Sequence, residues 1–255
     1  MSAVLLGTFL LNFIIHYFSS SHFFFYIFYF TIFHNMRQGL GITFLYRAGI
    51  KTHNSLIKFF YYFLTLAPFL IFHLRGPMNK GLLSDEILMP FYLHNYLSPL
   101  QHSFVINVLP LVYLGIACCF FIYLILTKNT KGIFTMAFFA SVYAYGFIFS
   151  TNELKSYVLL IFSHAIPYYF LMEKRIILTH TSRMIKKYAG FFLIAIFAFG
   201  GLVDYFQEDL VEMSGHFDSL AIALLTTPLI SHFIFDAIIW KKGNDRFKSF
   251  LQATI

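Results

Sequence analysis

The sequence predicts an all-helical membrane protein, a bundle of about eight transmembrane helices with both termini in the cytoplasm. The first observation is composition: 59% of the 255 residues are hydrophobic and only 11% are charged, whereas soluble domains carry about 25% charged residues. The second is a series of apolar segments of about the 20 residues that a helix needs to cross a bilayer. The third is the uneven distribution of Lys and Arg between the loops.

The apolar segments place all the predicted helices in one integral membrane domain, residues 1–255. We expect spans at about 3–18, 22–46, 55–73, 102–126, 132–150, 154–172, 189–206 and 219–240. The third span contains Pro68, which a membrane helix accommodates as a kink. Because the N-terminus lacks a basic region and a small-residue cleavage site, we expect the first span to be retained in the protein.

Lys and Arg gather on one of the two sides that these spans define. Fourteen of the 18 lie in, or within about one helical turn of, the loops after spans two, four and six or in the C-terminal tail, three lie in or next to the loops of the other side, and Arg37 lies deep within a span. Cytoplasmic loops of membrane proteins are enriched in Lys and Arg. Both termini are therefore expected in the cytoplasm, and the net charge of +7 indicates this face rather than a surface for nucleic acid.

Several well-known catalytic motifs are absent from the sequence. It has no GxxxxGK[ST] phosphate loop, no HExxH, no GxSxG and no CxxC, and it lacks the histidine boxes of membrane fatty-acid desaturases. Gly39 and Gly41 are too few for a nucleotide loop and are predicted to allow close helix packing. Cys118 and Cys119 are adjacent and cannot readily bridge each other, so we interpret them as small core residues.

Three histidines from three predicted spans fall at nearly the same depth in the bilayer. At a rise of about 1.5 Å per residue, His34 and His164 lie midway along the second and sixth spans. His232 lies slightly to the cytoplasmic side of the centre of the eighth span, and Asp236 follows it by one helical turn. Ionisable groups are costly in hydrocarbon and need partners there, so we expect these side chains to meet.

The predicted site therefore consists of His34, His164, His232 and Asp236. Neutral imidazoles suit iron, zinc or copper, and histidines with one carboxylate and open positions suit non-haem Fe(II). Asp236 has three open roles: a metal ligand, a group that orients His232, or the ion-pair partner of Arg37. Each histidine taken alone could instead form a hydrogen bond between helices. The residues expected around the site are Arg37, Gln38, Tyr46 and Tyr168.

A second set of histidines lies towards the outer side of the predicted bundle. Its members are close to the ends of spans or within the long loop Arg75–Gln101: His16, His22, His73, His94 and His102. They show no i, i+4 pairing along a helix. We interpret them as residues of the membrane boundary rather than as a second metal site.

Three segments resemble a group of largely uncharacterised bacterial multi-pass membrane proteins. They are HNMRQGLGITFLYR (34–47), SHAIPYYFLMEKR (163–175) and SHFIFDAIIWKK (231–242). A looser likeness, in architecture only, is to the bacterial type of membrane carotenoid-cleaving dioxygenases, which place histidines on several spans around an iron. This sequence lacks a fourth intramembrane histidine at the same depth. The resemblance implies the bacterial inner (cytoplasmic) membrane as the location.

The first functional hypothesis is a membrane-embedded, metal-dependent oxidoreductase that acts on a lipid or other apolar substrate from the bilayer. Its cofactor would be iron or another transition metal. The ligands would be His34, His164 and His232, with Asp236 as a ligand or an orienting group. The catalytic residues would be Arg37, Gln38 and Tyr168.

Two alternatives come from other functional classes. Buried His, Asp and Arg side chains also form proton relays in coupled transporters, although the sequence shows no inverted repeat of the kind that many transporters contain. The polar groups could also only pack helices in a structural or assembly subunit. Apart from the lipid bilayer and an apolar substrate, the sequence points to no partner, and nucleic acid is not expected.

Overall fold

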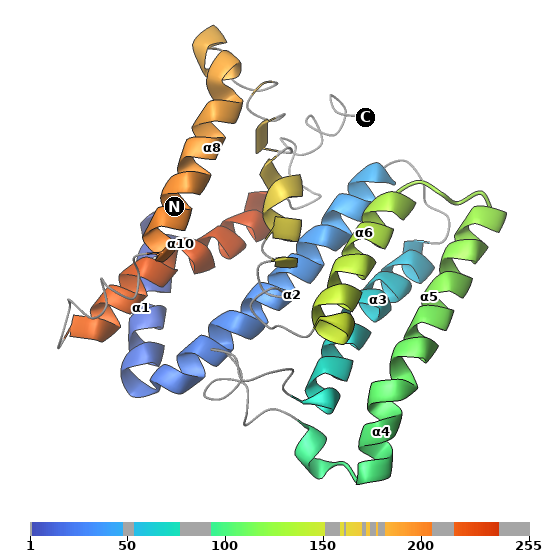
Figure 1. Cartoon of the computed structure of the whole chain (residues 1–255). Coiled ribbons are helices and arrows are strands. Elements are labelled where there is room, and N and C mark those ends of the chain that lie inside the picture. Colours follow the sequence, from blue (N-terminus) through green and yellow to red (C-terminus); the bar gives the residue numbers. More distant parts are fainter. Residues whose placement is uncertain are drawn as a thin grey trace. The chain divides into compact units, whose positions relative to one another are not determined.

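The protein is all-helical in the part of the chain that the computed structural model describes (Figure 1). The described residues are 2–47, 54–76, 93–150, 159–160, 162–169, 172–173, 177, 182–205 and 217–239. They contain eight α-helices, one short 3₁₀ helix and one π-helical turn, without any strand. The predicted all-helical class is confirmed.

The helices begin and end close to the bounds of the apolar segments, except that the helix Arg183–Tyr205 begins six residues before its predicted span 189–206. They are α1 (Ser2–Phe18), α2 (Ser20–Tyr46), α3 (Asn54–Arg75), α4 (Pro99–Asn107), α5 (Leu109–Leu126), α6 (Ile133–Ala144), α8 (Arg183–Tyr205) and α10 (Asp218–Ile239). The 3₁₀ helix η3 covers Leu93–Tyr96, and the π-helical turn η4 (Tyr145–Phe149) continues α6. The sixth predicted span is described in part and is helical at 159–160 and 162–169.

The fourth predicted span is two helices rather than one. Ser98 starts α4 with a capping box, in which its hydroxyl accepts from the Gln101 N–H while the Gln101 side chain accepts from the Ser98 N–H. The helix stops at Asn107, and α5 begins at Leu109. Pro110 explains the break, because it has no N–H to donate and its ring clashes with the carbonyl one turn earlier, that of Ile106.

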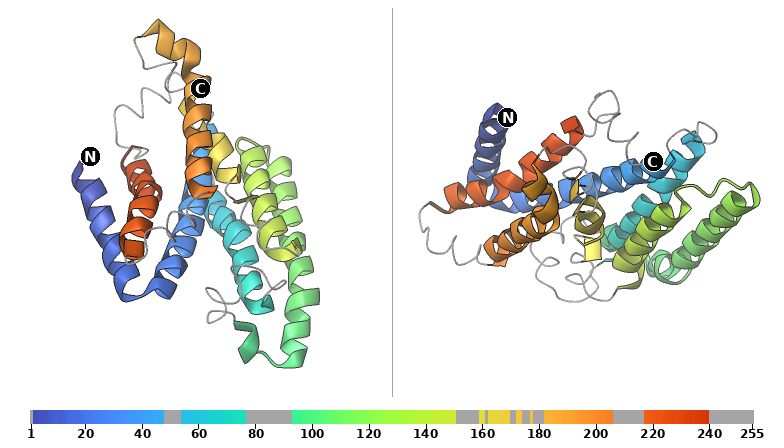
Figure 2. Two further views of the ribbon diagram at one scale, coloured as in Figure 1. Left: turned by 60° about the vertical axis from the view of Figure 1, so that its left-hand side comes forward. Right: turned by 90° about the horizontal axis from the view of Figure 1, so that it is seen from above.

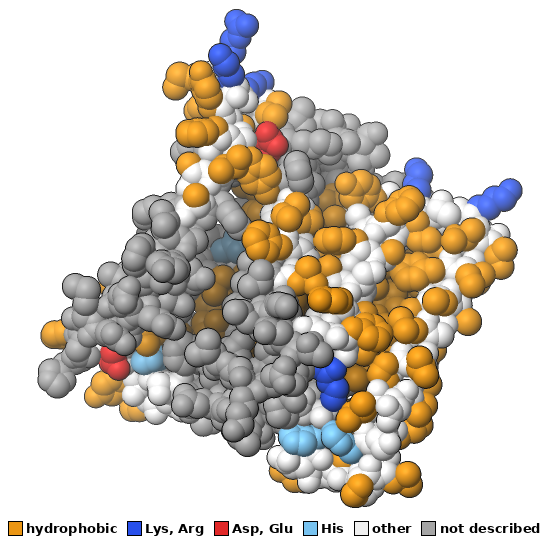
Figure 3. Space-filling model, in the orientation of Figure 1, with side chains coloured by type: hydrophobic (Ala, Val, Ile, Leu, Met, Phe, Trp, Pro, Cys, Tyr) orange, Lys and Arg blue, Asp and Glu red, His pale blue; other side chains and the backbone are white. Residues whose placement is uncertain are grey.

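Within the described ranges, two helical segments are long and apolar enough to cross a membrane, Asn54–Arg75 and Pro99–Leu126. Shorter apolar helices cover Ala3–Phe18, Ile133–Phe149 and Asp218–Ile234. Hydrophobic side chains cover much of the described surface over α5 (Figure 3). The number of eight transmembrane helices and the single membrane domain stay predictions.

Helix α5 buries one face only. Its buried residues recur every three or four positions: Tyr113, Ala117, Phe120 and Leu124. Cys118 and Cys119 fall between these positions, and both are exposed. Our interpretation of them as core residues was therefore wrong, because the uniformly apolar α5 sequence does not reveal which face packs inward.

The chain forms two compact units. The central unit comprises Phe30–Ile166, and the terminal unit comprises Met1–Tyr29 with Pro167–Ile255. In the central unit, α3 packs against both α5 and α6 (Figure 2). The ring of Phe60 on α3 stacks on Phe120 at 4.0 Å between centroids. The hydroxyl of Tyr113 donates to the Leu64 carbonyl at 2.9 Å.

Polar side chains join the helix ends of the central unit in two groups. At one end, Nη1 of Arg47, just after α2, donates to Oδ1 of Asn129 at 2.8 Å and to the Lys131 carbonyl at 3.0 Å. At the other, Arg75 at the end of α3 donates to the Ile148 and Ser150 carbonyls. Each group connects chain segments that the predicted topology, based on the distribution of Lys and Arg, places on the same side of the membrane.

In the terminal unit, α1 packs along α10 (Figure 2). Nδ2 of Asn12, a fully buried residue, donates to Oγ1 of Thr226 at 3.2 Å. Nδ1 of His16 lies 2.9 Å from Oγ of Ser219. The end of α1 therefore meets the beginning of α10, as expected for helices that run in opposite directions.

We expect the substitution Arg47→Met to lower the free energy of unfolding by about 2–3 kcal/mol, since each hydrogen bond from a charged donor contributes about 1.5–3 kcal/mol and part of this is recovered by relaxation. Arg47 is only 2% exposed, and Met retains much of its aliphatic stem. Thermal unfolding in detergent measures the effect. The control is Lys128→Met, which removes the same charge from an exposed position. An equal loss of stability in the two variants would contradict a stabilising role for the Arg47 hydrogen bonds.

A second prediction concerns two buried tyrosines of the central unit. Tyr61 is 0% exposed, and its hydroxyl finds no hydrogen-bond partner within the described residues. Tyr61→Phe is therefore expected to leave the free energy of unfolding unchanged or to raise it by up to about 1 kcal/mol. Tyr113→Phe removes the hydrogen bond from the tyrosine hydroxyl to the Leu64 carbonyl, and it should lower the free energy of unfolding by about 1 kcal/mol. Denaturant or thermal unfolding of both variants tests this, and an equal loss in the two would contradict it.

Candidate metal centre

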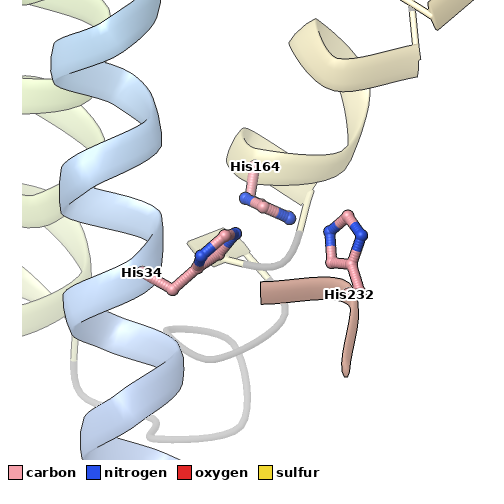
Figure 4. A group of neighbouring side chains, drawn as sticks. All are labelled: His34, His164 and His232. Carbon is pink, nitrogen blue, oxygen red and sulfur yellow. The ribbon is translucent and has the colours of Figure 1, made fainter. Parts of the chain in front are cut away.

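His34 and His164 are in contact within the central unit. Their ring centroids are 5.1 Å apart, with the ring planes at 67°. His34 comes from α2, and His164 comes from the helical residues 162–169 (Figure 4). Both side chains are half-buried, and Nε2 of His34 and Nδ1 of His164 are shielded from solvent. Two of the three histidines that the depth estimate placed at one level therefore meet.

The residues next to these histidines are buried and polar. Asn35, after His34, is 3% exposed, and Ser163, before His164, is also 3% exposed. Oγ of Ser163 donates to the Leu160 carbonyl at 2.8 Å. This hydrogen bond stabilises the helical turn directly before His164. Neither residue was predicted from the sequence to belong to the site. A signal was available, because Ser precedes His in both SHAIPYY and SHFIFDA.

His232 belongs to the terminal unit, where the Tyr168 ring packs against it. The two centroids are 5.1 Å apart with the planes at 87°, an edge-to-face arrangement that aromatic rings favour. The imidazole is half-buried, and Ser231 before it is 1% exposed. Tyr168 was expected near the site, and it contacts this histidine. Asp236 lies one turn further along α10, but its side chain is outside the described part of the chain.

His34 and His164 of the central unit and His232 of the terminal unit each carry imidazole nitrogens, which are suitable ligands for a metal ion (Figure 4). Imidazole nitrogen suits zinc, copper, iron and nickel. The donor set therefore fits a transition metal and does not fit magnesium or calcium, which prefer oxygen ligands.

The predicted catalytic residues of α2 lie on two different faces of the helix. Gln38 follows His34 at the i, i+4 spacing, is half-buried, and has its Oε1 shielded from solvent. Arg37 is exposed and lies on the neighbouring stripe, with its Cζ 5.8 Å from the centroid of the Phe33 ring. Tyr46, at the end of the helix, is 63% exposed. The roles given to Arg37, Gln38 and Tyr168 stay predictions.

The outer histidines are divided between the two units. In the central unit, His94 and His102 are 6.1 Å apart between ring centroids, and Nε2 of His102 lies 2.8 Å from the Arg75 carbonyl. Burial, and secondly the neighbouring His102, lower the pKa of His94. His73 is buried at 6% exposure and packs edge-on against Phe69. The His22 side chain lies outside the described part.

No protein-family model, curated protein or solved structure matches this chain. The resemblance of the three short motifs to bacterial multi-pass membrane proteins stays a prediction.

Proposed function

We propose that the protein is a membrane-embedded, metal-dependent oxidoreductase with about eight spans, acting on a lipid or other apolar substrate. The observation that carries the proposal is the contact between His34 and His164. Two imidazoles from segments far apart in the sequence come together with a nitrogen of each shielded from solvent. Ionisable groups within the apolar part of a membrane protein are rare and usually functional.

In this proposal His232 is the third ligand of the metal. Three imidazole ligands leave coordination positions open, as catalytic metal sites do for water or substrate. The metal, iron or another transition metal, would supply activation of dioxygen as the oxidant or polarisation of a substrate oxygen. The side chains of the protein would keep the three imidazoles neutral and oriented, because only a neutral imidazole offers a nitrogen lone pair to a metal.

The surrounding residues receive roles from their positions. The edge-to-face contact of Tyr168 restrains the His232 ring, which would hold its nitrogen in place. Gln38, one turn from His34 on the same face, would hydrogen-bond a polar group of the substrate. The exposed Arg37 would bind the headgroup of a lipid substrate, and Asp236 would orient His232 or ligate the metal.

A membrane location is supported by the composition and by two helical segments long and apolar enough to cross a bilayer. The grouping of helix ends in the central unit fits spans two to five of the predicted topology. We propose the bacterial inner membrane, with both termini in the cytoplasm. An apolar substrate would then enter from the bilayer rather than from water.

Metal analysis of the purified full-length protein tests this function. Protein expressed with iron, zinc, copper and manganese in the medium and purified in detergent without chelators should contain about one transition metal ion per chain, because a resident metal is retained when its ligands are pre-positioned. Inductively coupled plasma mass spectrometry measures it. A chain that carries no stoichiometric metal, and takes up none of the four ions when they are added, would overturn the proposal.

A further inference from the structure

A cavity of about 560 Å³ lies in the terminal unit, where the end of α1 meets the beginning of α10. Its volume falls in the range of about 300–1,000 Å³ that is usual for small-molecule sites. The residues around it belong to α1 and α10 or lie next to their ends: Ser19 and Ser20 follow α1, and Phe217 directly precedes α10. His232, which we propose as a metal ligand, is not among them.

Four aromatic side chains form much of the wall of this cavity: Phe13, Tyr17, Phe18 and Phe217. The rings of Phe13 and Tyr17 stack at 5.9 Å between centroids, and Phe18 stands at 90° to Tyr17 at 5.4 Å. Tyr17, Phe18 and Phe217 are 66%, 79% and 68% exposed. The face of an aromatic ring carries negative electrostatic potential, so rings grouped around one space attract a cation.

One carboxylate, that of Asp218, lies in the same wall, and no Lys or Arg is present among the described residues that line the cavity. Oδ1 of Asp218 accepts from the Ser219 N–H at 2.5 Å and lies 3.4 Å from the Ser219 hydroxyl. That hydroxyl is in turn 2.9 Å from Nδ1 of His16. These contacts hold the carboxylate in place at the cavity.

We propose that this cavity binds an organic ammonium group, carried by a lipid headgroup such as phosphoethanolamine or phosphocholine or by a soluble amine. Aromatic rings around a cation, with a carboxylate beside them, are the arrangement by which proteins recognise quaternary ammonium ions. The hydroxyls of Ser19 and Ser20, also in the wall, are suited to the phosphate or hydroxyl that accompanies such an ammonium group. The inference does not depend on the metal centre.

Aromatic residues at helix ends are common at membrane surfaces. Exposed rings alone would therefore indicate only the membrane–water interface and not a binding site. Two features are specific to this place. Three of the rings belong to α1 and the fourth, Phe217, directly precedes α10, yet all four line one cavity, and Asp218 belongs to the same wall. A boundary residue such as Tyr96, 82% exposed on η3 of the central unit, lines neither of the two cavities described around the helices.

The experiment measures binding of phosphocholine and of tetramethylammonium to the full-length protein, by isothermal titration calorimetry in a detergent that has no ammonium group. Asp218→Asn, which retains the shape of the side chain, should weaken binding about tenfold, and Phe217→Leu about threefold. Tyr96→Leu is the matched aromatic control and should change nothing. A tert-butyl alcohol of the same shape as choline, but without the charge, should bind the wild type much more weakly.

A second measurement identifies the source of the ammonium group. Native mass spectrometry of protein extracted from vesicles of equal parts phosphatidylethanolamine and phosphatidylglycerol shows which lipid is retained. Selective retention of phosphatidylethanolamine that is lost in Asp218→Asn assigns a lipid headgroup. Binding of the soluble probes without lipid selectivity assigns a soluble amine. The inference is overturned if the wild type binds neither, if the uncharged alcohol binds as well as phosphocholine, or if Asp218→Asn and Phe217→Leu bind like the wild type.

Discussion

The substitutions His34→Ala and His164→Ala are each expected to lower the affinity for the bound transition metal by more than about 100-fold, so that the purified variants contain almost none. The two imidazoles lie 5.1 Å apart between centroids and offer one nitrogen each to the metal. Mutation of a residue that only hydrogen-bonds to a metal ligand already lowers the metal affinity about 10–100-fold. Removal of a ligand itself must therefore lower the affinity further. Metal content by mass spectrometry and competition with a chelator of known affinity measure the effect.

The matched control is His94→Ala, which removes a histidine from the central unit outside the candidate group. It should retain the metal at the wild-type level. His232→Ala tests the third proposed ligand in the same way. Asp236→Asn separates the roles open to this residue: an orienting carboxylate predicts a loss of about 10–100-fold, while a direct ligand predicts a loss as large as those of the histidines.

Two outcomes would contradict the metal assignment. One is a variant series in which all four histidine substitutions retain equal amounts of metal, since the site would then lie elsewhere. The other is a wild type that contains and binds no metal, in which case the shielded histidines would favour the proton-coupled transporter. Flux into proteoliposomes, compared between the wild type and Asp236→Asn, would then be the informative measurement.

The positions of most helices could be predicted from the sequence because most are long apolar segments bounded by polar residues or glycine. Asn54–Arg75 and Ser2–Phe18 differ from the expected bounds by one or two residues. What the apolar pattern conceals is the interruption of a helix. Pro110 ends α4 within a continuous apolar segment, and the π-helical turn Tyr145–Phe149 replaces the last turn of α6. Neither change alters the hydropathy of the segment, so length and composition could not reveal them.

The contact between His34 and His164 could be anticipated because depth along a helix follows from residue number alone. Direction around the helix does not, unless the sequence contrasts polar and apolar faces. In α2 nearly every position is apolar or aromatic before His34, so the sequence could not show that Arg37 lies on an exposed stripe beside Phe33. For the same reason the burial of Asn35 and Ser231 was not foreseen.

The two glycines of α2 show the same difference between pattern and packing. Both were predicted to allow close approach of another helix. A Cβ on Gly39 would overlap the hydroxyl of Tyr61 and lie 2.9 Å from Cε1 of Phe139, while a Cβ on Gly41 would have nothing within 4 Å. The prediction is confirmed for Gly39 and wrong for Gly41, because residues two apart on a helix point about 200° apart.

The substitution Gly39→Ala should therefore destabilise the central unit by about 2–3 kcal/mol, the cost of forcing extra volume into a well-packed core. Tyr61 and Phe139 are 0% and 2% exposed and have little room to move. Gly41→Ala is the matched control on the same helix, and it should stabilise the protein by up to about 1 kcal/mol, because Ala favours helix over Gly. Thermal unfolding in detergent gives both values.

The double variant Gly39→Ala/Tyr61→Phe identifies the clash behind the loss. Removing the Tyr61 hydroxyl eliminates the closest overlap but leaves the Phe139 contacts at 2.9 and 3.0 Å, so about half of the stability lost in Gly39→Ala should return. Because the two residues are in contact, their effects should not add, and the difference measures the coupling. Additive effects, or a Gly39→Ala variant as stable as Gly41→Ala, would show that α2 does not pack against α3 through this glycine.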